Sequence, residues 1–433
     1  MAGGVAIRGR RHYGWTVAAI TFLALLVAAG MRSAPSVLIV PLEEEFGWTR
    51  ASISVAIALQ LLLYGLIGPF AAGVVDRFGA RPIMAGGLAL MAVSFGATFF
   101  VTAAWQLLLV WGVGMGLATG AMALVLGAII ATRWFVARRG LVMGLLTGSA
   151  AGGQLVFLPL LANIVVHYSW RLSVMVASII AVAIIPVVLL LIRDQPADVG
   201  LKPYGAPEDA PDEPGRSRAN PFGAAFAALG IGLVSRDFWL LSGSFFICGA
   251  STLGLIGTHF IPACMDHGIP EATAAGILAA MGVFNFIGTT ASGWLSDRFD
   301  SRHLLFWYYA LRGLSLMFLP YSFDLSFWGL SLFGVFYGLD WVATVPPTVR
   351  LTANAFGSQN AGVMFGWVSV VHQIGSAAVA FGAGLMRTQF GNYSSAFVLS
   401  GALCLIAAIM VLGIGKKRRD HATPRPALVT AES

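Results

Sequence analysis

The chain alternates long apolar runs with short polar segments. Each run has close to the ~20 residues that a helix needs to cross a bilayer. Unpaired backbone groups exclude loops from lipid, so each run is expected to be helical. We predict twelve membrane-spanning helices, at residues 14–40, 50–74, 82–102, 105–131, 140–165, 171–192, 237–262, 271–295, 303–321, 326–349, 361–386 and 394–415. The pattern therefore predicts an all-α polytopic membrane protein.

A charged string between two apolar runs occurs twice. It reads Asp-Arg-Phe at 76–78 and again at 297–299, an offset of 221 residues in a chain of 433. Six predicted spans separate the copies, and an even number leaves both copies on the same side. Duplication of this kind indicates two six-helix halves with parallel orientation. We expect the halves at 1–192 and 237–416, a cytoplasmic linker at 193–236 and a cytoplasmic tail at 417–433.

The linker is rich in Pro, Asp, Glu and Gly, which is typical of a connecting segment. Its end, from Asn220 to Trp239, could form a short amphipathic helix on the inner membrane surface. A plain connector between the halves is the favoured interpretation.

Composition supports a membrane protein. Hydrophobic residues make up 58% of the chain and charged residues 10%, and the mean hydropathy is +0.82. A soluble globular protein carries about 25% charged residues. Most of the surface is therefore expected to face membrane lipid.

The basic residues fix the orientation. Of the 26 Lys and Arg, 21 fall on one predicted side, whereas Arg50, Arg171 and Arg387 fall on the other. Arg32 and Arg312 lie within spans. Cytoplasmic loops carry the excess of Lys and Arg, so both ends and the middle loop are predicted to be cytoplasmic, in the cell (inner) membrane. Binding of nucleic acid is a poor interpretation of the net charge of +7, because the basic residues are scattered over short loops.

An enzyme is not expected. The three cysteines show no metal spacing and no disulfide framework, and core filling is the expected role of each. No nucleophile elbow or phosphate loop is present, and the glycines at 112–116 lie inside a predicted span. We expect no cofactor and no metal. Without an ATP-binding motif, an ion gradient is the expected source of energy.

Residues 72–81 carry a family resemblance. They resemble the loop motif Gly-x-x-x-Asp-Arg-x-Gly-Arg-Arg of the major facilitator superfamily, with departures at Ala72 and Ala80. Residues 12–15 (His-Tyr-Gly-Trp) and 41–48 (Pro-Leu-Glu-Glu-Glu-Phe-Gly-Trp) resemble bacterial relatives of the monocarboxylate and oxalate/formate transporters. The resemblance implies the major facilitator fold, in which spans 1, 4, 7 and 10 line a central path.

The repeated string is expected to form a gate. Its charges can pair with acids or with helix ends at the cytoplasmic rim and latch the halves closed. Alternatively, the arginines only fix topology, but topology does not require an aspartate at a set position. We favour the latch, formed by Asp76, Arg77, Arg81, Asp297 and Arg298.

Ionisable groups inside spans are costly and are functional candidates by default. By the resemblance, the substrate path can be reached by Arg32, Gln154, Asn285, Asp340 and His372, with Trp341 and Gln373 beside them. Arg32 can hold a carboxylate by two parallel hydrogen bonds. The alternative for Arg32 is that its side chain extends to the outer interface.

Three residues are candidates for proton coupling: Asp340, His372 and Arg312. We expect Arg312 to pair with Asp340, which would keep both groups charged at depth. A static salt bridge is the alternative for this pair, and a neutral core histidine is the alternative for His372. Pro346 and Pro347 are expected to break span ten near its inner end, as a hinge or as the point where the helix ends.

One departure bears on the substrate. Carboxylate transporters of this kind commonly carry an arginine in span eight, where this chain has Thr289. The first hypothesis is proton-coupled symport of a small organic anion by a monomer that works through alternating access. The second is antiport efflux of a drug or metabolite, although its usual arginine in span four and Gly-Pro pair in span five are absent. A non-transporting membrane scaffold or sensor is the third.

Overall fold

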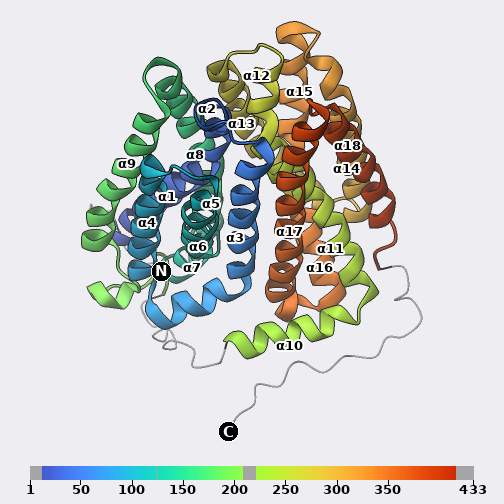
Figure 1. Ribbon diagram of the computed structural model, residues 1–433. Helices are drawn as coiled ribbons and strands as arrows, with labels where there is room; N and C mark the ends of the chain where they lie inside the picture. The colour runs from blue at the N-terminus through green and yellow to red at the C-terminus, as the bar shows by residue number, and fades with distance from the viewer. Residues whose placement is uncertain (1–11, 123, 208–220, 416–433) are drawn as a thin grey trace.

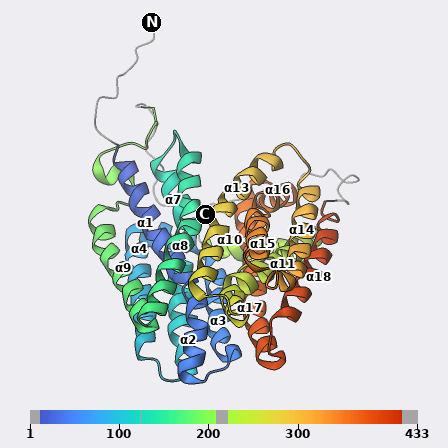
Figure 2. The same cartoon turned by 90° about the horizontal axis from the view of Figure 1, so that it is seen from above.

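The computed structural model describes residues 12–122, 124–207 and 221–415. In this part of the chain the secondary structure is helical, without a strand. The helices form two bundles that stand side by side, one from the blue and green elements and one from the yellow and red ones (Figure 1, Figure 2). The predicted all-α class is confirmed.

The first bundle runs from residue 13 to residue 191. Its elements are α1 (Tyr13–Ser33), α2 (Pro35–Phe46), α3 (Arg50–Phe78), α4 (Ala80–Ala97), η1 (Thr98–Phe100), α5 (Ala104–Leu107), η2 (Leu108–Met115), α6 (Gly116–Ala121), α7 (Leu124–Trp134), α8 (Arg139–His167) and α9 (Trp170–Leu191).

The short helices η3 (Pro196–Val199) and α10 (Pro221–Leu233) follow in the connecting segment. The second bundle contains α11 (Arg236–Gly249), η4 (Ala250–Ile256), α12 (Gly257–Asp266), α13 (Glu271–Ser296), α14 (Ser301–Ser322), α15 (Ser326–Asp340), α16 (Val345–Phe356), α17 (Ser358–Phe390) and α18 (Ser394–Val411).

Eleven helical stretches in the described part are long and apolar enough to cross a membrane. The predicted span at 303–321 is the one outside this set, and it corresponds to α14. This helix has 22 residues, but Arg302, His303 and Arg312 make it more polar than the others. The span count from hydropathy is therefore consistent with the fold but not identical to it.

Local signals in the sequence set where these helices begin and end. The side chains of Thr49, Ser169 and Asp300 accept backbone N–H groups at the starts of α3, α9 and α14. Such caps satisfy donors that have no partner within the helix. The repeated string differs between its copies here: Gly79 has φ of 92°, which favours glycine, whereas its counterpart Asp300 has φ of −62°.

Two spans are interrupted where they pass the centre of the molecule. The first breaks at Ala34, between α1 and α2, and the tenth breaks at residues 341–344, between α15 and α16. We expected the second break at Pro346 and Pro347, and that position is wrong, because α15 already ends at Asp340. The prolines lie in the first turn of α16, where a missing N–H leaves no helical hydrogen bond unmade.

Two further spans contain π-helical segments, η2 and η4. Segments of this kind widen the helix locally and often occur at functional sites. All four irregularities lie in spans 1, 4, 7 and 10.

The two bundles pack against each other along a seam between α3 and α17. A Cβ atom on Gly65 would come within 2.4 Å of the Gln373 Cβ, and one on Gly384 would come within 2.5 Å of the Ser54 hydroxyl. Only glycine permits such an approach. A second seam lies between α8 and α13, where Gly282 faces the backbone of Ala151.

The two ends of the molecule differ. We call the end with the charged strings the repeat end and the opposite one the Arg50 end. At the Arg50 end, α2 of the first bundle packs on α12 of the second. Comparable packing between α7 and α16, at the repeat end, is absent from the described part. The helices that join the halves therefore differ: α2 and α12 at the Arg50 end, and α10, which packs on both α3 and α17, at the repeat end.

The helix α10 lies across the repeat end, beneath α3 and α17 (Figure 1). The Trp367 indole donates to the Ala225 carbonyl at 2.8 Å, and Phe226 packs between Phe70 and Trp367. A plain connector, the favoured interpretation, is therefore wrong for residues 221–233. Residues 208–220 of the linker and the predicted tail at 417–433 lie outside the described part.

Candidate functional site

A small cavity lies between the two bundles, near the breaks in the helices. Its volume is about 30 Å³, which is room for one or two water molecules. Both halves contribute to the lining, which consists of Arg32, Ser33, Pro35, Ser36, Ile57, Gln60, Leu61, Gln154, Leu253, Gly257 and Thr258. We call this the central cavity.

Arg32 brings a positive charge to the central cavity. It lies in the last turn of α1, and its guanidinium carbon is 5.0 Å from the centre of the Tyr64 ring. The side chain is half-buried, and in the described part of the chain no ion pair holds it. Its cation is therefore held in place by an aromatic ring, with no fixed anion beside it.

Two glutamines flank Arg32. Gln154, a predicted site residue, donates to the Ser33 hydroxyl at 3.1 Å. Gln60 donates to the Arg32 carbonyl at 3.5 Å, and its own carbonyl oxygen is buried without a hydrogen-bond partner. Sequence reasoning missed Gln60, although a glutamine within an apolar run is a signal of the same kind as Gln154. The cavity thus offers one cation and one unoccupied acceptor.

The predicted pair of Arg312 and Asp340 is present, and its pairing is confirmed. The Arg312 Nε donates to the Asp340 Oδ2 at 2.5 Å, and the Arg312 Nη2 donates to the Asp340 carbonyl at 2.7 Å and to the Trp341 carbonyl at 3.3 Å. Arg312 is 1% exposed. α15 ends here, and Arg312 is an additional donor to the carbonyls at this end, because the Asp340 carbonyl also accepts from the Ala343 N–H at 3.2 Å.

Cys248 belongs to the same cluster. Its sulfur lies 3.0 Å from the Arg312 Nη1 and 3.3 Å from the Thr344 hydroxyl. His372 interacts electrostatically with this thiol, and its ring packs on Phe245 with the ring centres 4.6 Å apart. The structure thus gathers the three candidates for proton coupling around one buried thiol.

The remaining substrate candidates do not line the central cavity. The Asn285 side-chain oxygen accepts from the Val342 N–H at 3.2 Å and from the Thr289 hydroxyl at 3.0 Å, so it holds the break in span ten. Trp341 lies in that break and packs edge-on against Tyr337. Gln373 packs on Gly65 in the seam. Contact of these residues with a substrate stays a prediction.

The gate predicted from the repeated string makes contacts within each half. Arg81 donates its backbone N–H to the Asp194 carboxylate at 2.9 Å. Arg298 stacks over Trp294, with the guanidinium carbon 4.0 Å from the ring centre, and Asp297 is 3.3 Å from Arg350.

Arg77 is exposed and lies over Phe78, whereas the side chain of Asp76 lies outside the described part. The latch stays a prediction. In the described residues of this end, the two charged strings make no ion pair between the halves.

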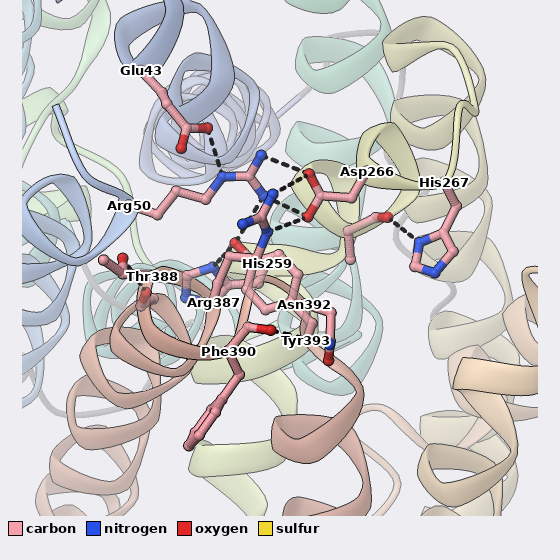
Figure 3. A network of polar contacts seen from close by, with 12 residues as sticks. Glu43, Arg50, His259, Asp266, His267, Arg387, Thr388, Phe390, Asn392 and Tyr393 are labelled. Carbon is pink, nitrogen blue, oxygen red and sulfur yellow. Dashed lines mark hydrogen bonds and ion pairs between the residues drawn. The ribbon is translucent and has the colours of Figure 1, made fainter. Parts of the chain in front are cut away.

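Ion pairs do join the halves at the Arg50 end (Figure 3). Arg50 of α3 donates to Asp266 of α12 at 2.7 and 2.9 Å and to Glu43 of α2 at 2.7 Å. Arg387 of α17 donates to the same Asp266 carboxylate at 2.7 and 3.1 Å. We call these four residues the Arg50 cluster. Arg50 itself is 4% exposed.

A second layer supports the Arg50 cluster. The Tyr393 hydroxyl lies 3.3 Å from Arg50 and 3.1 Å from the buried His259 ring. Burial raises the pKa of Tyr393 to about 12, although the nearby Arg50 opposes this shift. The hydroxyl therefore stays neutral.

Sequence reasoning missed the Arg50 cluster. It counted Arg50 and Arg387 only as outside charges. A signal was nevertheless available, because the predicted topology places Glu43, Arg50, Asp266 and Arg387 at one end.

The family model of the Major Facilitator Superfamily matches residues 21–380 and, a second time, 260–431. The uncharacterized MFS-type transporter YcxA of Bacillus subtilis is 24% identical over 402 residues, which cover 90% of this chain and 92% of that protein. Monocarboxylate transporter 11 of Homo sapiens is 27% identical over 417 residues, which cover 93% of this chain and 83% of that protein.

Among solved structures, a similar fold is found in a bacterial homolog to the human lysosomal transporter Spinster, in an inward-facing and occupied conformation. The TM-score is 0.70 at 15% identity, with 94% of this chain and 97% of that chain covered.

Proposed function

The chain belongs to the major facilitator superfamily, and from this premise we propose that it is a secondary transporter that carries a small organic anion together with protons. The proposed substrate is a small carboxylate, and the proposed mechanism is alternating access by a monomer in the cell (inner) membrane. The similarity to monocarboxylate transporters supports this substrate class.

Arg32 is the observation that carries the proposal. A cation with no fixed anion, at a cavity formed by both halves, is what an anion carrier requires. A carboxylate can accept two parallel hydrogen bonds from a guanidinium. Arg32 would also supply the cation that span eight lacks. Thr289, which stands at that position, donates its hydroxyl to the Asn285 side chain.

The proposed conformation is inward-facing. The excess of Lys and Arg assigns the repeat end to the cytoplasm, so the Arg50 cluster closes the outer end. Asp266 and Arg50 come from opposite halves, and their hydrogen bonds must break before the outer end can open. At the inner end, the proposed latch of Asp76, Arg77, Arg81, Asp297 and Arg298 would be the counterpart that forms when that end closes.

Asp340 is the proposed proton carrier, with Arg312 and His372 as its neighbours in the coupling cluster. The second oxygen of Asp340 is buried without a hydrogen-bond partner, so it can take up a proton without displacing Arg312. Because Asp340 ends α15 at the break in span ten, its charge state acts on the element that must move. In the static alternative, Arg312 and Asp340 only stabilise this break.

Uptake into proteoliposomes tests the function. A panel of small radiolabelled acids is offered at two external pH values, with and without an inward proton gradient. We expect at least one monocarboxylate to accumulate more strongly when the outside is acidic. No accumulation of any acid, together with proton-driven movement of uncharged drugs, would overturn anion symport in favour of antiport efflux.

Asp340→Asn separates coupling from binding. We expect this variant to lose proton-driven accumulation about tenfold or more while it still exchanges internal for external substrate. Asp324→Asn, an exposed acid on the same half, is the matched control. Full accumulation by Asp340→Asn would assign the Arg312 pair to structure alone.

A further inference from the structure

A second and larger cavity opens at the Arg50 end. Its volume is about 430 Å³. The first half lines it through α2, α8 and the start of α9, and the second half lines it through the end of α12 and the start of α13. The lining residues are Val40, Pro41, Glu44, Glu45, Val165, Val166, Ser169, Trp170, Met265 and Glu271. We call it the outer pocket.

Three glutamates face the outer pocket, and among the described residues only Glu45 is paired with a cation. Glu45 accepts hydrogen bonds from the Trp170 indole at 2.5 Å and from Arg171 at 2.9 Å. Arg171 also lies over the Trp170 ring, with the guanidinium carbon 4.3 Å from its centre. The charge of Glu45 is therefore already compensated.

Glu271 is the unusual member of this set. It is 5% exposed, and its Oε1 is buried without a hydrogen-bond partner. A buried carboxyl oxygen without a hydrogen-bond partner is costly, so a donor from outside the chain would stabilise it. Glu44 lies on the opposite wall of the outer pocket. In the described part of the chain, neither glutamate has an ion pair.

The neighbouring Arg50 cluster has a cation between acids of the two halves. There, Glu43 of the first half and Asp266 of the second are joined by the Arg50 guanidinium (Figure 3). One residue along α2, Glu44 faces Glu271 of the second half, and the space between them is the outer pocket. The same arrangement of acids from both halves thus occurs twice, once with a cation supplied by the chain and once without.

We propose that the outer pocket binds a small organic ammonium ion between Glu44 and Glu271. An ammonium group is compact and offers up to three donors, which matches the exposed Glu44 and the unpartnered Glu271 oxygen. The apolar side chains of Val40, Val165 and Met265 can receive its alkyl part. Metal binding is a poorer fit, because in the described part of the chain no group of three His, Cys, Asp or Glu could hold a metal ion.

Occupancy has a conformational consequence. Because Glu44 and Glu271 belong to different halves, an ammonium ion binds only while the Arg50 end is closed. The bound ammonium ion therefore stabilises the closed state of the Arg50 end, by as much as its affinity for this state exceeds its affinity for the open one. Binding of the ammonium ion itself does not depend on which substrate the carrier moves.

The test is a titration of the purified full-length protein in lipid nanodiscs with n-butylammonium chloride, followed by isothermal calorimetry and by the melting temperature. We expect a saturable signal and a rise in Tm, with half-saturation on the order of 1 mM. Sodium chloride at equal ionic strength and uncharged n-butanol are the controls, and neither should give saturation. Binding of either control as strongly as n-butylammonium would overturn the proposal.

Two variants locate the site. Glu271→Gln and Glu44→Gln should each raise the half-saturating concentration about tenfold, because each removes one charge-assisted contact. Asp324→Asn, an exposed acid of the second half that does not line the outer pocket, should bind as the unmodified protein does. Should Glu271→Gln not fold, the exposed Glu44→Gln decides alone. Unchanged affinity in the folded variants would overturn the proposal.

Discussion

Arg32 and Arg312 are both arginines at membrane depth, and their surroundings are opposite. Arg312 in the second half is enclosed by two backbone carbonyls, one carboxylate, a thiol and a hydroxyl. Arg32 in the first half touches one aromatic ring and lines a cavity. Polar groups of the fold compensate the charge of Arg312. Among the described residues, no acid compensates the charge of Arg32.

The difference shows how a buried cation can be interpreted. A guanidinium whose acceptors are all supplied by the fold stabilises that fold, and removal of one partner leaves the other uncompensated. A guanidinium without a fixed anion is free to bind one. The two arginines contribute equally to hydropathy. Only their neighbours in the structure distinguish a structural role from a binding role.

The largest expected effect is a difference in the free energy of unfolding between the variants Arg312→Met and Arg32→Met. Arg312→Met leaves the Asp340 carboxylate without its donor and removes hydrogen bonds to two carbonyls, so the free energy of unfolding should fall by about 3–5 kcal/mol. Arg32→Met breaks no ion pair of the fold and should change it by less than about 1 kcal/mol. Thermal denaturation in nanodiscs measures both.

The double variant Arg312→Met/Asp340→Leu sharpens this result. It removes the uncompensated acid together with the cation and should recover much of the stability lost by Arg312→Met. Equal losses in Arg312→Met and Arg32→Met would break the comparison.

Arg50 is an intermediate case, because its acids come from both halves. Asp266→Asn weakens charge-assisted hydrogen bonds to Arg50 and Arg387 that contribute about 1.5–3 kcal/mol each. The population with an open Arg50 end should rise about tenfold or more.

Pulsed electron resonance measures this opening through spin labels at Tyr168→Cys and Tyr321→Cys, two exposed positions on opposite halves. A longer distance is expected in Asp266→Asn and not in the control Asp324→Asn. An unchanged distance distribution would show that the Arg50 cluster is not a gate.

The smallest effect on stability is expected for the exposed ion pair between Arg302 and Asp300. Hydrogen bonds from Arg302 lower the pKa of Asp300 to about 2. Since the folded pKa lies below the ordinary value, the pair stabilises the fold above about pH 4, and this contribution is lost as the pH falls toward 2.

Asp300→Asn keeps a side chain that can cap α14 and removes only the charge. The loss should be below about 1 kcal/mol at neutral pH and should vanish in acid. A loss as large as that of Arg312→Met would show that burial does not separate these pairs.

Much of the fold could be predicted because lipid imposes a simple rule on the chain. Apolar runs gave the spans, and the duplicated string gave the parallel halves. The pair of Arg312 and Asp340 was also predicted, because two opposite charges at similar depth in adjacent spans have few other partners.

What could not be predicted depends on packing between distant segments. The Arg50 cluster joins residues 216 positions apart, and a count of loop charges contains no information on such pairs. The break after Asp340 was placed too late, because the prolines mark the start of α16 and the carbonyls that Arg312 caps leave no mark in the sequence. Gln60 faces the cavity only because α3 turns that side inward.

The most direct measurement compares the affinity for the proposed carboxylate substrate with the affinity for its uncharged amide, in the unmodified protein and in Arg32→Gln. If Arg32 holds the anion, the preference for the carboxylate should fall about 10–100-fold in Arg32→Gln, with the amide unaffected. Arg32→Lys should recover only part of it, because an ammonium cannot make the two parallel hydrogen bonds. An unchanged preference in Arg32→Gln would contradict the account and leave Arg32 as an anchor.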